Sequence, residues 1–339
     1  MALRVGIAGY GLAGRVFHAP LLKGVGFDVV GVLTSNPERK ASAESDFPGV
    51  KVVESIEQLL ELDLNLLVIA TPNSVHASQA IAGLKAGVPV VVDKPMGRSL
   101  KETEEIIQAS KQFNTPVTTF FNRKWDSDAL TVKKVIKDGV IGKIFRLESR
   151  FERFRKEINP GSWRENQDAS EGGGILLDLQ PHLLSTALDW FGPAELVHAS
   201  VREIRGASDD DVVLVLKHDS GVDSYLSASA IVGAPGPRIR INGDAGSLVI
   251  TELDHQEDLL RKGIKPAPGK WISPEEIKSE ARIFKGESSF NYPSEPGSYP
   301  SFYTAVRNHL EIGSPLPISR EFALDVARIL DKAREISAR

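Results

Sequence analysis

The first third of the chain alternates short apolar runs with segments of helical composition, and this alternation limits the folds open to it. Strands are expected at residues 3–8, 27–33, 50–53, 66–70, 88–92 and 116–120. Helices are expected between them, for example Pro37–Asp46, with Asn36 as its N-cap. Strands that alternate with helices at this spacing form a doubly wound parallel sheet. The sequence therefore predicts a six-stranded Rossmann domain over residues 1–121.

After residue 121 the pattern changes. Helices are expected at 126–137 and 175–191, and successive strands joined by short turns between 195 and 250. Such strands indicate an antiparallel or mixed sheet. We therefore predict a C-terminal α/β domain over residues 122–339, with a large open, mostly antiparallel sheet.

The end of the chain carries weaker signals. Residues 254–300 are rich in proline, glycine and charge, and we expect them to form long surface connections. Two helices, at about 301–312 and 320–337, are expected to close the chain, and the last is expected to pack back on the first domain.

Composition excludes several classes of protein. The net charge of the 339 residues is −4 without a basic tract, so neither nucleic acid nor an anionic membrane is an expected partner. The absence of cysteine excludes disulfides, thiolate nucleophiles and cysteine-based zinc sites. No apolar run approaches the roughly 18 residues of a membrane span. Because the first strand starts at Leu3, no signal peptide is expected, and we predict a cytoplasmic protein.

A glycine-rich turn follows the first expected strand. It consists of Gly9, Tyr10, Gly11, Leu12, Ala13 and Gly14. Between a strand and a helix, the pattern Gly-x-Gly-x-x-Gly predicts a dinucleotide site. Gly9 allows the tight turn, Gly11 lets the backbone approach a pyrophosphate, and Gly14 permits close packing of helix and strand. All six residues are therefore predicted to contact a cofactor.

The end of the second strand indicates which nicotinamide cofactor is bound. NAD enzymes usually place Asp or Glu there, against the ribose 2′-hydroxyl. This chain has no acid at that point, and the predicted contacts are Thr34, Ser35, Asn36 and Arg39. Hydroxyls, an amide and a guanidinium suit a 2′-phosphate, which favours NADP. NAD stays open, because Arg39 belongs to the following helix.

Two later strand ends add further candidates. The loop after the strand at 66–70 is predicted to line the nicotinamide half of the cofactor with Thr71, Pro72, Asn73 and His76. The strand at 88–92 runs into Asp93 and Lys94, and Pro95 then disfavours a helical conformation at Lys94. An ammonium group thus stands at the sheet edge where open α/β folds bind ligands. Asp93 and Lys94 are both predicted cofactor contacts, and a surface lysine is the alternative for an isolated Lys-Pro.

The other strong signal is Gly172-Gly173-Gly174, followed by Asp178 and His182. Three glycines permit close backbone approach. Asp178 and His182 are four residues apart, so in a helix they lie on one face, between apolar neighbours. A structural hydrogen bond and a catalytic role are alternatives for this pair. No third ligand stands at a metal-site spacing, and the acidic run 209–211 is expected to be a solvated turn.

Together the three motifs resemble the glucose–fructose oxidoreductase/inositol dehydrogenase/rhizopine catabolism (Gfo/Idh/MocA) family, whose Glu-Lys-Pro corresponds here to Asp93-Lys94-Pro95. Other segments, such as Asn122-Arg123-Lys124-Trp125-Asp126 and Ser162-Trp163-Arg164-Glu165, are similar to a narrower group, the bacterial scyllo-inositol dehydrogenases. The resemblance implies a catalytic trio of Lys94, Asp178 and His182. It also implies an open sheet used for oligomerisation, so a homo-oligomer, a dimer or a tetramer, is expected.

The implied reaction is reversible oxidation of a secondary alcohol on a polyol or cyclic sugar, such as scyllo-inositol, with NADP or NAD. His182 would act as general base, Lys94 would stabilise the developing charge, and Asp178 would orient a hydroxyl or the imidazole. Predicted substrate contacts are Asn122, Arg123, Trp163 and Arg155. A non-catalytic nucleotide sensor of the same fold and a sugar–sugar oxidoreductase with tightly bound cofactor are the alternatives.

Overall fold

The structure is a computed structural model that describes residues 2–206, 208–267, 271 and 278–337. Its polypeptide forms two compact units, and each is described by itself. The first unit comprises Met1–Phe120, Gln256–Ile272 and Ser298–Leu324. The second comprises Phe121–His255, Ser273–Gly297 and Asp325–Arg339.

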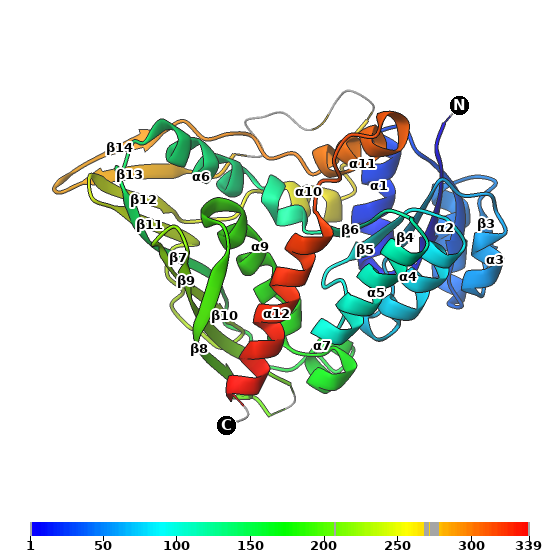
Figure 1. The fold of residues 1–339 in the computed structure, drawn as a ribbon, viewed down its shortest axis with the longest axis horizontal. Coiled ribbons are helices and arrows are strands. Elements are labelled where there is room, and N and C mark those ends of the chain that lie inside the picture. Colours follow the sequence, from blue (N-terminus) through cyan, green and yellow to red (C-terminus); the bar gives the residue numbers. More distant parts are fainter. Residues whose placement is uncertain (1, 207, 268–270, 272–277, 338–339) are drawn as a thin grey trace. The chain divides into compact units, whose positions relative to one another are not determined.

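A parallel sheet of six strands, in the order β3-β2-β1-β4-β5-β6, forms the centre of the first unit (Figure 1). Its strands are β1 (Arg4–Ala8), β2 (Asp28–Leu33), β3 (Lys51–Val53), β4 (Leu66–Ile69), β5 (Val90–Asp93) and β6 (Val117–Phe120). The valines of β5 are at most 1% exposed, because both faces of a parallel sheet are covered. The strand order is that of a Rossmann fold, so this prediction is confirmed.

The helices of the first unit start where local chemistry predicts. They include α2 (Pro37–Asp46), α3 (Ile56–Leu60), α4 (His76–Lys85), α5 (Leu100–Gln112), α10 (Gln256–Arg261) and α11 (Pro300–Ile312). The side chains of Asn36 and Ser99 cap α2 and α5 by accepting the N–H groups of Arg39 and Glu102. These caps fix the loops that leave the sheet edge.

The helix expected at 14–23 consists of two parts. A π-helical segment, η1 (Leu12–His18), leads into α1 (Ala19–Gly24). Pro20 lacks an N–H and stands in the first turn of α1, where that donor is not needed. The proline thus explains why a new helix begins at Ala19.

A sheet of eight strands forms the centre of the second unit, in the order β14-β13-β12-β11-β7-β10-β9-β8 (Figure 1). Its strands are β7 (Ile144–Glu152), β8 (Ala194–Arg202), β9 (Asp211–His218), β10 (Asp223–Ser229), β11 (Ile239–Gly243), β12 (Gly246–Ile250), β13 (Ala281–Lys285) and β14 (Ser288–Tyr292). Only β7 and β10 pair in parallel, so the predicted mostly antiparallel sheet is confirmed.

The helices of this unit include α6 (Ser127–Asp138), α7 (Trp163–Asn166), α8 (Ile175–Asp178) and α9 (Gln180–Phe191). Of these, α8 and α9 pack against the sheet, and α6 packs against α9. The core between α9 and the sheet includes Leu147 and Leu226, neither of which is exposed. The last helix is α12 (Arg320–Ser337). Among the described residues, none of the helices is both long enough and apolar enough to cross a lipid bilayer.

The expectation of surface connections over 254–300 is wrong for part of that segment. Residues 281–292 form the β13–β14 hairpin, and α10 precedes it. Buried Ala281 and Ile283 alternate with exposed Arg282 and Phe284, which is the period of a half-buried strand. The strands of this hairpin are short and lie in a segment rich in polar residues, so the composition did not indicate them.

Candidate active site

The glycine turn between β1 and η1 has the geometry that a pyrophosphate cradle needs. Gly9 has φ +92°, and a Cβ there would lie 2.6 Å from the carbonyl oxygen of Ala70. A Cβ on Gly14 would lie 2.0 Å from the carbonyl oxygen of Gly9. At Gly11, by contrast, the first atom that a Cβ would meet is 3.7 Å away, on the side chain of Arg39. The backbone at Gly11 is thus open to a close ligand, and the turn fits a dinucleotide.

The other residues of the turn differ in exposure. Tyr10 is 1% exposed, and its hydroxyl donates a hydrogen bond to Asp46 at 3.1 Å. Burial, followed by the charge of Asp46, raises the pKa of Tyr10. Leu12, in contrast, is 48% exposed at the start of η1, and Ala13 follows it half-buried. Tyr10 therefore serves the packing of the turn, whereas the predicted contact through Leu12 has an accessible side chain.

The predicted 2′-phosphate site lies at the end of β2. The Thr34 hydroxyl accepts the N–H of Asn36, and the Asn36 side chain accepts the N–H of Arg39 at 3.0 Å. Ser35 and Arg39 are exposed, and the Arg39 guanidinium lies 3.7 Å from the Cβ position of Gly11. Arg39 thus points toward the glycine turn. Its cation is available to a phosphate on that side of the sheet.

Lys94 follows β5 directly, and its backbone is held by its neighbour. Asp93 is 13% exposed and accepts the Lys94 N–H at 2.8 Å. The Nε2 atom of His18 lies 3.8 Å from the same carboxylate, and its Nδ1 atom lies 2.6 Å from the Tyr303 hydroxyl. Burial raises the pKa of Asp93, but His18 and Lys94 outweigh it and lower this pKa to about 2. A carboxylate anion therefore supports the strand end that carries the ammonium group.

His76 connects the loops after β4 and β5. It is 1% exposed, and its ring nitrogens lie 3.0 Å from the carbonyl oxygen of Pro95 and 2.9 Å from that of Thr71. Burial lowers the pKa of this histidine. Nearby, Asn73 is buried and Pro72 is exposed. The contact of His76 with a cofactor stays a prediction, and its observed partners give it a role in placing the loop of Lys94.

In the second unit, the triple glycine packs against the protein itself. A Cβ on Gly173 would lie 1.9 Å from the carbonyl oxygen of Gln167. Gly174 has φ +89°, and a Cβ there would lie 1.8 Å from a carboxylate oxygen of Asp209. Both glycines are therefore needed for the entry of the chain into α8.

The helix expected over 175–191 is broken, so the prediction that Asp178 and His182 share one helix face is wrong. Asp178 ends α8, Leu179 lies between the helices, and α9 begins at Gln180. Pro181 is the reason, because inside a longer helix it would remove a hydrogen bond and clash with the preceding turn. Asp178 is 25% exposed and pairs with Arg164 at 3.2 Å. His182 is 8% exposed, with its ring centroid 6.1 Å from that of Phe151.

The acidic run 209–211 is buried, so the expected solvated turn is wrong. Asp209 accepts the Leu176 N–H at 2.6 Å and thereby caps α8. Asp210 pairs with Arg205 at 2.9 Å, and Asp211 accepts from Arg202 at 2.9 Å.

Asp209 is the buried carboxylate of this region that the sequence did not indicate. Burial raises its pKa to about 6, although the N–H of Leu176 opposes this. The one available signal was the pair of arginines shortly before the run, which can neutralise Asp210 and Asp211 but says nothing of Asp209.

The predicted substrate contacts are distributed around the same helices. Arg123 is 8% exposed, pairs with Asp126 at 3.3 Å and lies over the ring of Phe151 at 5.6 Å. Trp163 is half-buried under the Arg164 guanidinium, 4.5 Å from its ring. Asn122 is half-buried at the start of η3 (Asn122–Trp125), and Arg155 is exposed. The structure thus connects Arg123 with His182 through Phe151, and Trp163 with Asp178 through Arg164.

Lys94 belongs to the first unit, whereas Asp178 and His182 belong to the second. Their convergence on one substrate therefore stays a prediction. Within the ranges that the structure describes, no group of three His, Asp or Glu side chains is arranged to hold a metal ion.

Comparisons with known proteins match this architecture. Residues 3–121 match a family model described as "Oxidoreductase family, NAD-binding Rossmann fold", and residues 129–249 match the GFO/IDH/MocA C-terminal domain. The scyllo-inositol 2-dehydrogenase (NADP(+)) IolW of Bacillus subtilis is 32% identical over 99% of this chain and 94% of its own length. The Escherichia coli oxidoreductase YdgJ is 33% identical over 97% and 94%. The solved structure of yvaA from Bacillus subtilis has a TM-score of 0.88 and 31% identity, covering 99% of this chain and 98% of that one.

Proposed function

The chain belongs to the GFO/IDH/MocA family of oxidoreductases, and we propose that it reversibly oxidises a secondary alcohol of a polyol or cyclic sugar with a nicotinamide cofactor. One observation carries most of this proposal. Lys94 stands at the carboxyl end of β5, in the same sheet as the strand that leads into the glycine turn. Open α/β sheets bind their ligands at that edge.

Each of the three candidate catalytic residues has a distinct role in this proposal. His182 takes the proton of the reacting hydroxyl as general base. Lys94 donates a hydrogen bond to the same oxygen and stabilises its developing negative charge. Asp178, held by Arg164, orients a second hydroxyl or the imidazole. When bound, the dinucleotide would supply the hydride acceptor through its nicotinamide ring, and the turn at Gly9 and Gly11 would hold its pyrophosphate.

NADP is the proposed cofactor, with NAD as the alternative. The position of the Arg39 guanidinium beside Gly11 supports it, as does the absence of an acid at the end of β2. Replacing Arg39 by Ala should weaken NADP binding about 10- to 100-fold, because a hydrogen bond to a charged group contributes about 1.5–3 kcal/mol. Calorimetry with NADP and NAD measures this, and Lys51→Ala on β3 is the charge-matched control. Equal losses of affinity for NADP and NAD would show that Arg39 does not bind the 2′-phosphate.

The first substrate to test is scyllo-inositol, because it is the named substrate of the IolW relative. Purified protein is incubated with NADP or NAD and a panel of polyols, and the absorbance of the reduced nicotinamide is followed. We expect an absorbance increase with at least one polyol. A sensor would bind the cofactor without any absorbance change, and that result would overturn the proposal. A sugar–sugar oxidoreductase would retain its cofactor through purification and need no added nicotinamide.

We also propose that the chain forms a homo-oligomer through the open face of the eight-stranded sheet. Tyr225 on β10 is 40% exposed, while its neighbour Leu226 is buried on the helix side. Tyrosine is enriched at protein interfaces, and this one is accessible to a second copy of the chain. Light scattering of wild type and Tyr225→Glu tests this, and a monomeric wild type would contradict it.

A further inference from the structure

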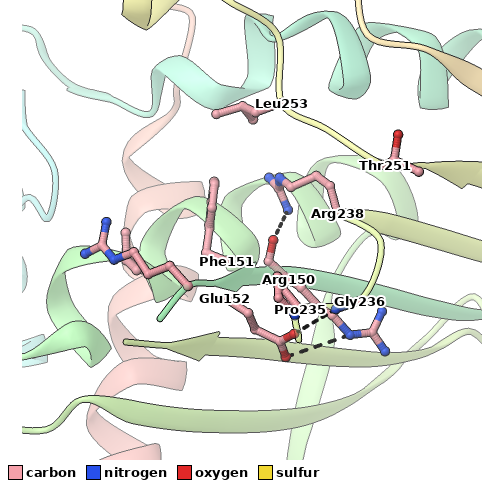
Figure 2. Close-up of a pocket in the computed structure, with 10 residues that line it drawn as sticks. Arg150, Phe151, Glu152, Pro235, Gly236, Arg238, Thr251 and Leu253 are labelled. Carbon is pink, nitrogen blue, oxygen red and sulfur yellow. Dashed lines mark hydrogen bonds and ion pairs between the residues drawn. The ribbon is translucent and has the colours of Figure 1, made fainter. Parts of the chain in front are cut away.

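A cavity of about 240 Å³ opens in the second unit where β7 ends (Figure 2). Its walls come from the end of β7, the loop before β11, the residues after β12 and the break between α8 and α9. The lining residues are Arg150, Phe151, Glu152, Arg153, Leu179, Pro235, Gly236, Arg238, Thr251 and Leu253. Three of these side chains are cationic and only one is anionic, so the cavity is unusually rich in positive charge.

The cavity adjoins the candidate catalytic residues of this unit. Leu179 in its wall is the residue between Asp178 and the helix that carries His182. The ring of Phe151 contacts both His182 and an arginine of the cavity wall. Its centroid lies 6.1 Å from that of the His182 ring and 3.9 Å from the Arg238 guanidinium. A group bound in the cavity would therefore be part of a ligand that also reaches His182.

Two of the three arginines in the wall are engaged by the protein. Arg150 pairs with Glu148 at 2.5 Å. It also lies 3.8 Å from Glu152 (Figure 2). Arg238 donates to the hydroxyl of Ser149 at 2.8 Å and lies 3.5 Å from Asp128. Their charges already have partners, so a ligand is not needed to explain them.

Arg153 differs from both. Its Nε atom is buried and has no hydrogen-bond acceptor, and no carboxylate in the described part of the chain lies within ion-pair distance of its guanidinium. Burial, and then the charge of Arg155, lower the pKa of Arg153, and the more weakly acting charges of Asp178 and Glu165 only partly oppose this. A cation that is partly removed from water without a carboxylate in direct contact is costly, and an anion supplied from outside lowers that cost.

Most of the described charged side chains around Arg153 are paired with one another and do not form an ion pair with it. Arg164 is paired with Asp178, and Arg205 with Glu165 and Asp210 at 3.1 and 2.9 Å. Arg155, two residues after Arg153 in the extended segment that continues β7, likewise has no carboxylate partner among the described residues. Residues two apart in an extended segment face the same side, so the free charge of both arginines is on one side of the chain.

We propose that the substrate carries an anionic group, a carboxylate or a phosphate, and that Arg153 binds this group in the cavity beside Phe151. This inference rests on the proposed function and narrows its substrate class to acidic polyols or acidic sugars. A guanidinium offers a planar pair of donors that matches both anions. The cavity is smaller than the roughly 300–1,000 Å³ of sites that enclose a whole ligand, as expected for a subsite that takes one substituent.

The test compares neutral and acidic substrates on variants of one residue. Wild type, Arg153→Ala and Arg153→Lys are assayed with scyllo-inositol, an inositol monophosphate and glucuronate, which separates phosphate from carboxylate. We expect wild type to have a kcat/KM at least about 10-fold higher for one of the acids, and Arg153→Ala to lose that advantage while its activity on scyllo-inositol is unchanged. Arg153→Lys should keep part of it. The exposed Arg282 of β13, replaced by Ala, is the control for a general loss of positive charge.

The outcomes separate this inference from the proposed function. If scyllo-inositol is used as well as the acids, or if Arg153→Ala lowers both equally, the anionic subsite is wrong and the dehydrogenase proposal stands. If no compound is oxidised, the proposed function fails. Calorimetry of each acid with the NADP-loaded protein then decides the subsite by itself, because heat of binding that disappears in a folded Arg153→Ala variant supports it and its absence in wild type overturns it.

Discussion

The region around Lys94 and the region around Asp178 and His182 are held in place by different means. At Lys94 the support comes from buried ionisable side chains, chiefly Asp93 and His18. At the other region the support comes from the backbone, with glycines that leave no room for a Cβ. The region around Lys94 should therefore be destabilised when the charge of a supporting side chain is removed. The region around Asp178 and His182 should be destabilised when a Cβ is added to one of its glycines.

The two regions also contain carboxylates with opposite pKa shifts. Asp93 faces His18 and Lys94, which lower its pKa to about 2. Asp209 faces backbone N–H groups with Asp210 nearby, and burial raises its pKa to about 6. Stability should therefore depend on pH in opposite directions at the two sites.

The largest effect is expected for Gly174→Ala, in the region supported by backbone packing. The new Cβ would overlap the carboxylate of Asp209 and the residue would keep a φ near +89°. Gly174 has ψ 161°, a conformation found essentially only at glycine, and holding alanine there should cost about 1–3 kcal/mol. With overpacking of about 1–3 kcal/mol, the free energy of unfolding should fall by roughly 2–6 kcal/mol. Urea denaturation measures this.

Gly192→Ala is the matched control for that variant. Gly192 has φ +78°, but a Cβ there would meet nothing within 4 Å. Its ψ of −165° puts it in the same backbone region as Gly174, so Gly192→Ala should lose only the conformational strain of about 1–3 kcal/mol. Equal losses in both variants would mean that the contact with Asp209 is unimportant.

A smaller loss in the free energy of unfolding is expected for Asp93→Asn, in the region around Lys94 that charged side chains support. A pKa lowered from 3.8 to about 2 corresponds to about 2 kcal/mol of stability. Because the pKa of the folded state is lowered, this stability is present above about pH 4 and is lost as the pH falls toward 2. Denaturation between pH 2 and 7 should therefore show a difference between wild type and variant that vanishes in acid. Asp28→Asn, at the exposed start of β2, should show none.

The smallest effect, and one of opposite sign, is expected for Asp209→Asn. Its folded-state pKa is raised, so wild type loses stability as the pH rises from about 4 to about 6. Asparagine keeps an acceptor for the Leu176 N–H without the charge, so the variant should be more stable at pH 7, by an amount of the order of 1 kcal/mol. The same pH series measures it. If Asp209→Asn is less stable than wild type at pH 7 and its stability still falls between pH 4 and 6, the charged carboxylate of Asp209 is stabilising. The contrast drawn here between Asp209 and Asp93 would then be wrong.

The Rossmann half could be predicted from the sequence because its signals are local. The apolar strands, the caps Asn36 and Ser99 and the glycine turn each act within a few residues, and the structure has all of them. The domain boundary at 121, the cytoplasmic location and the oligomeric state stay predictions.

The second half was predicted less well because its decisive contacts are distant in sequence. Gly174 packs on Asp209, which lies 35 residues later, and the pattern around Gly172 cannot indicate that partner. Pro181 was compatible with a helix start, but the apolar residues before it resembled one continuous helix. Asp210 and Asp211 appeared exposed because the sequence does not show which arginines reach them.

The most direct test of the account is the turnover of Lys94→Ala on the best substrate of wild type, measured together with its dissociation constant for NADP. Loss of one donor to a developing oxyanion should lower kcat by about 10²- to 10³-fold. The dissociation constant should change little, because the glycine turn and Arg39 are untouched. A variant with the kcat of wild type would contradict the assignment of this lysine as the group that stabilises the reacting oxygen.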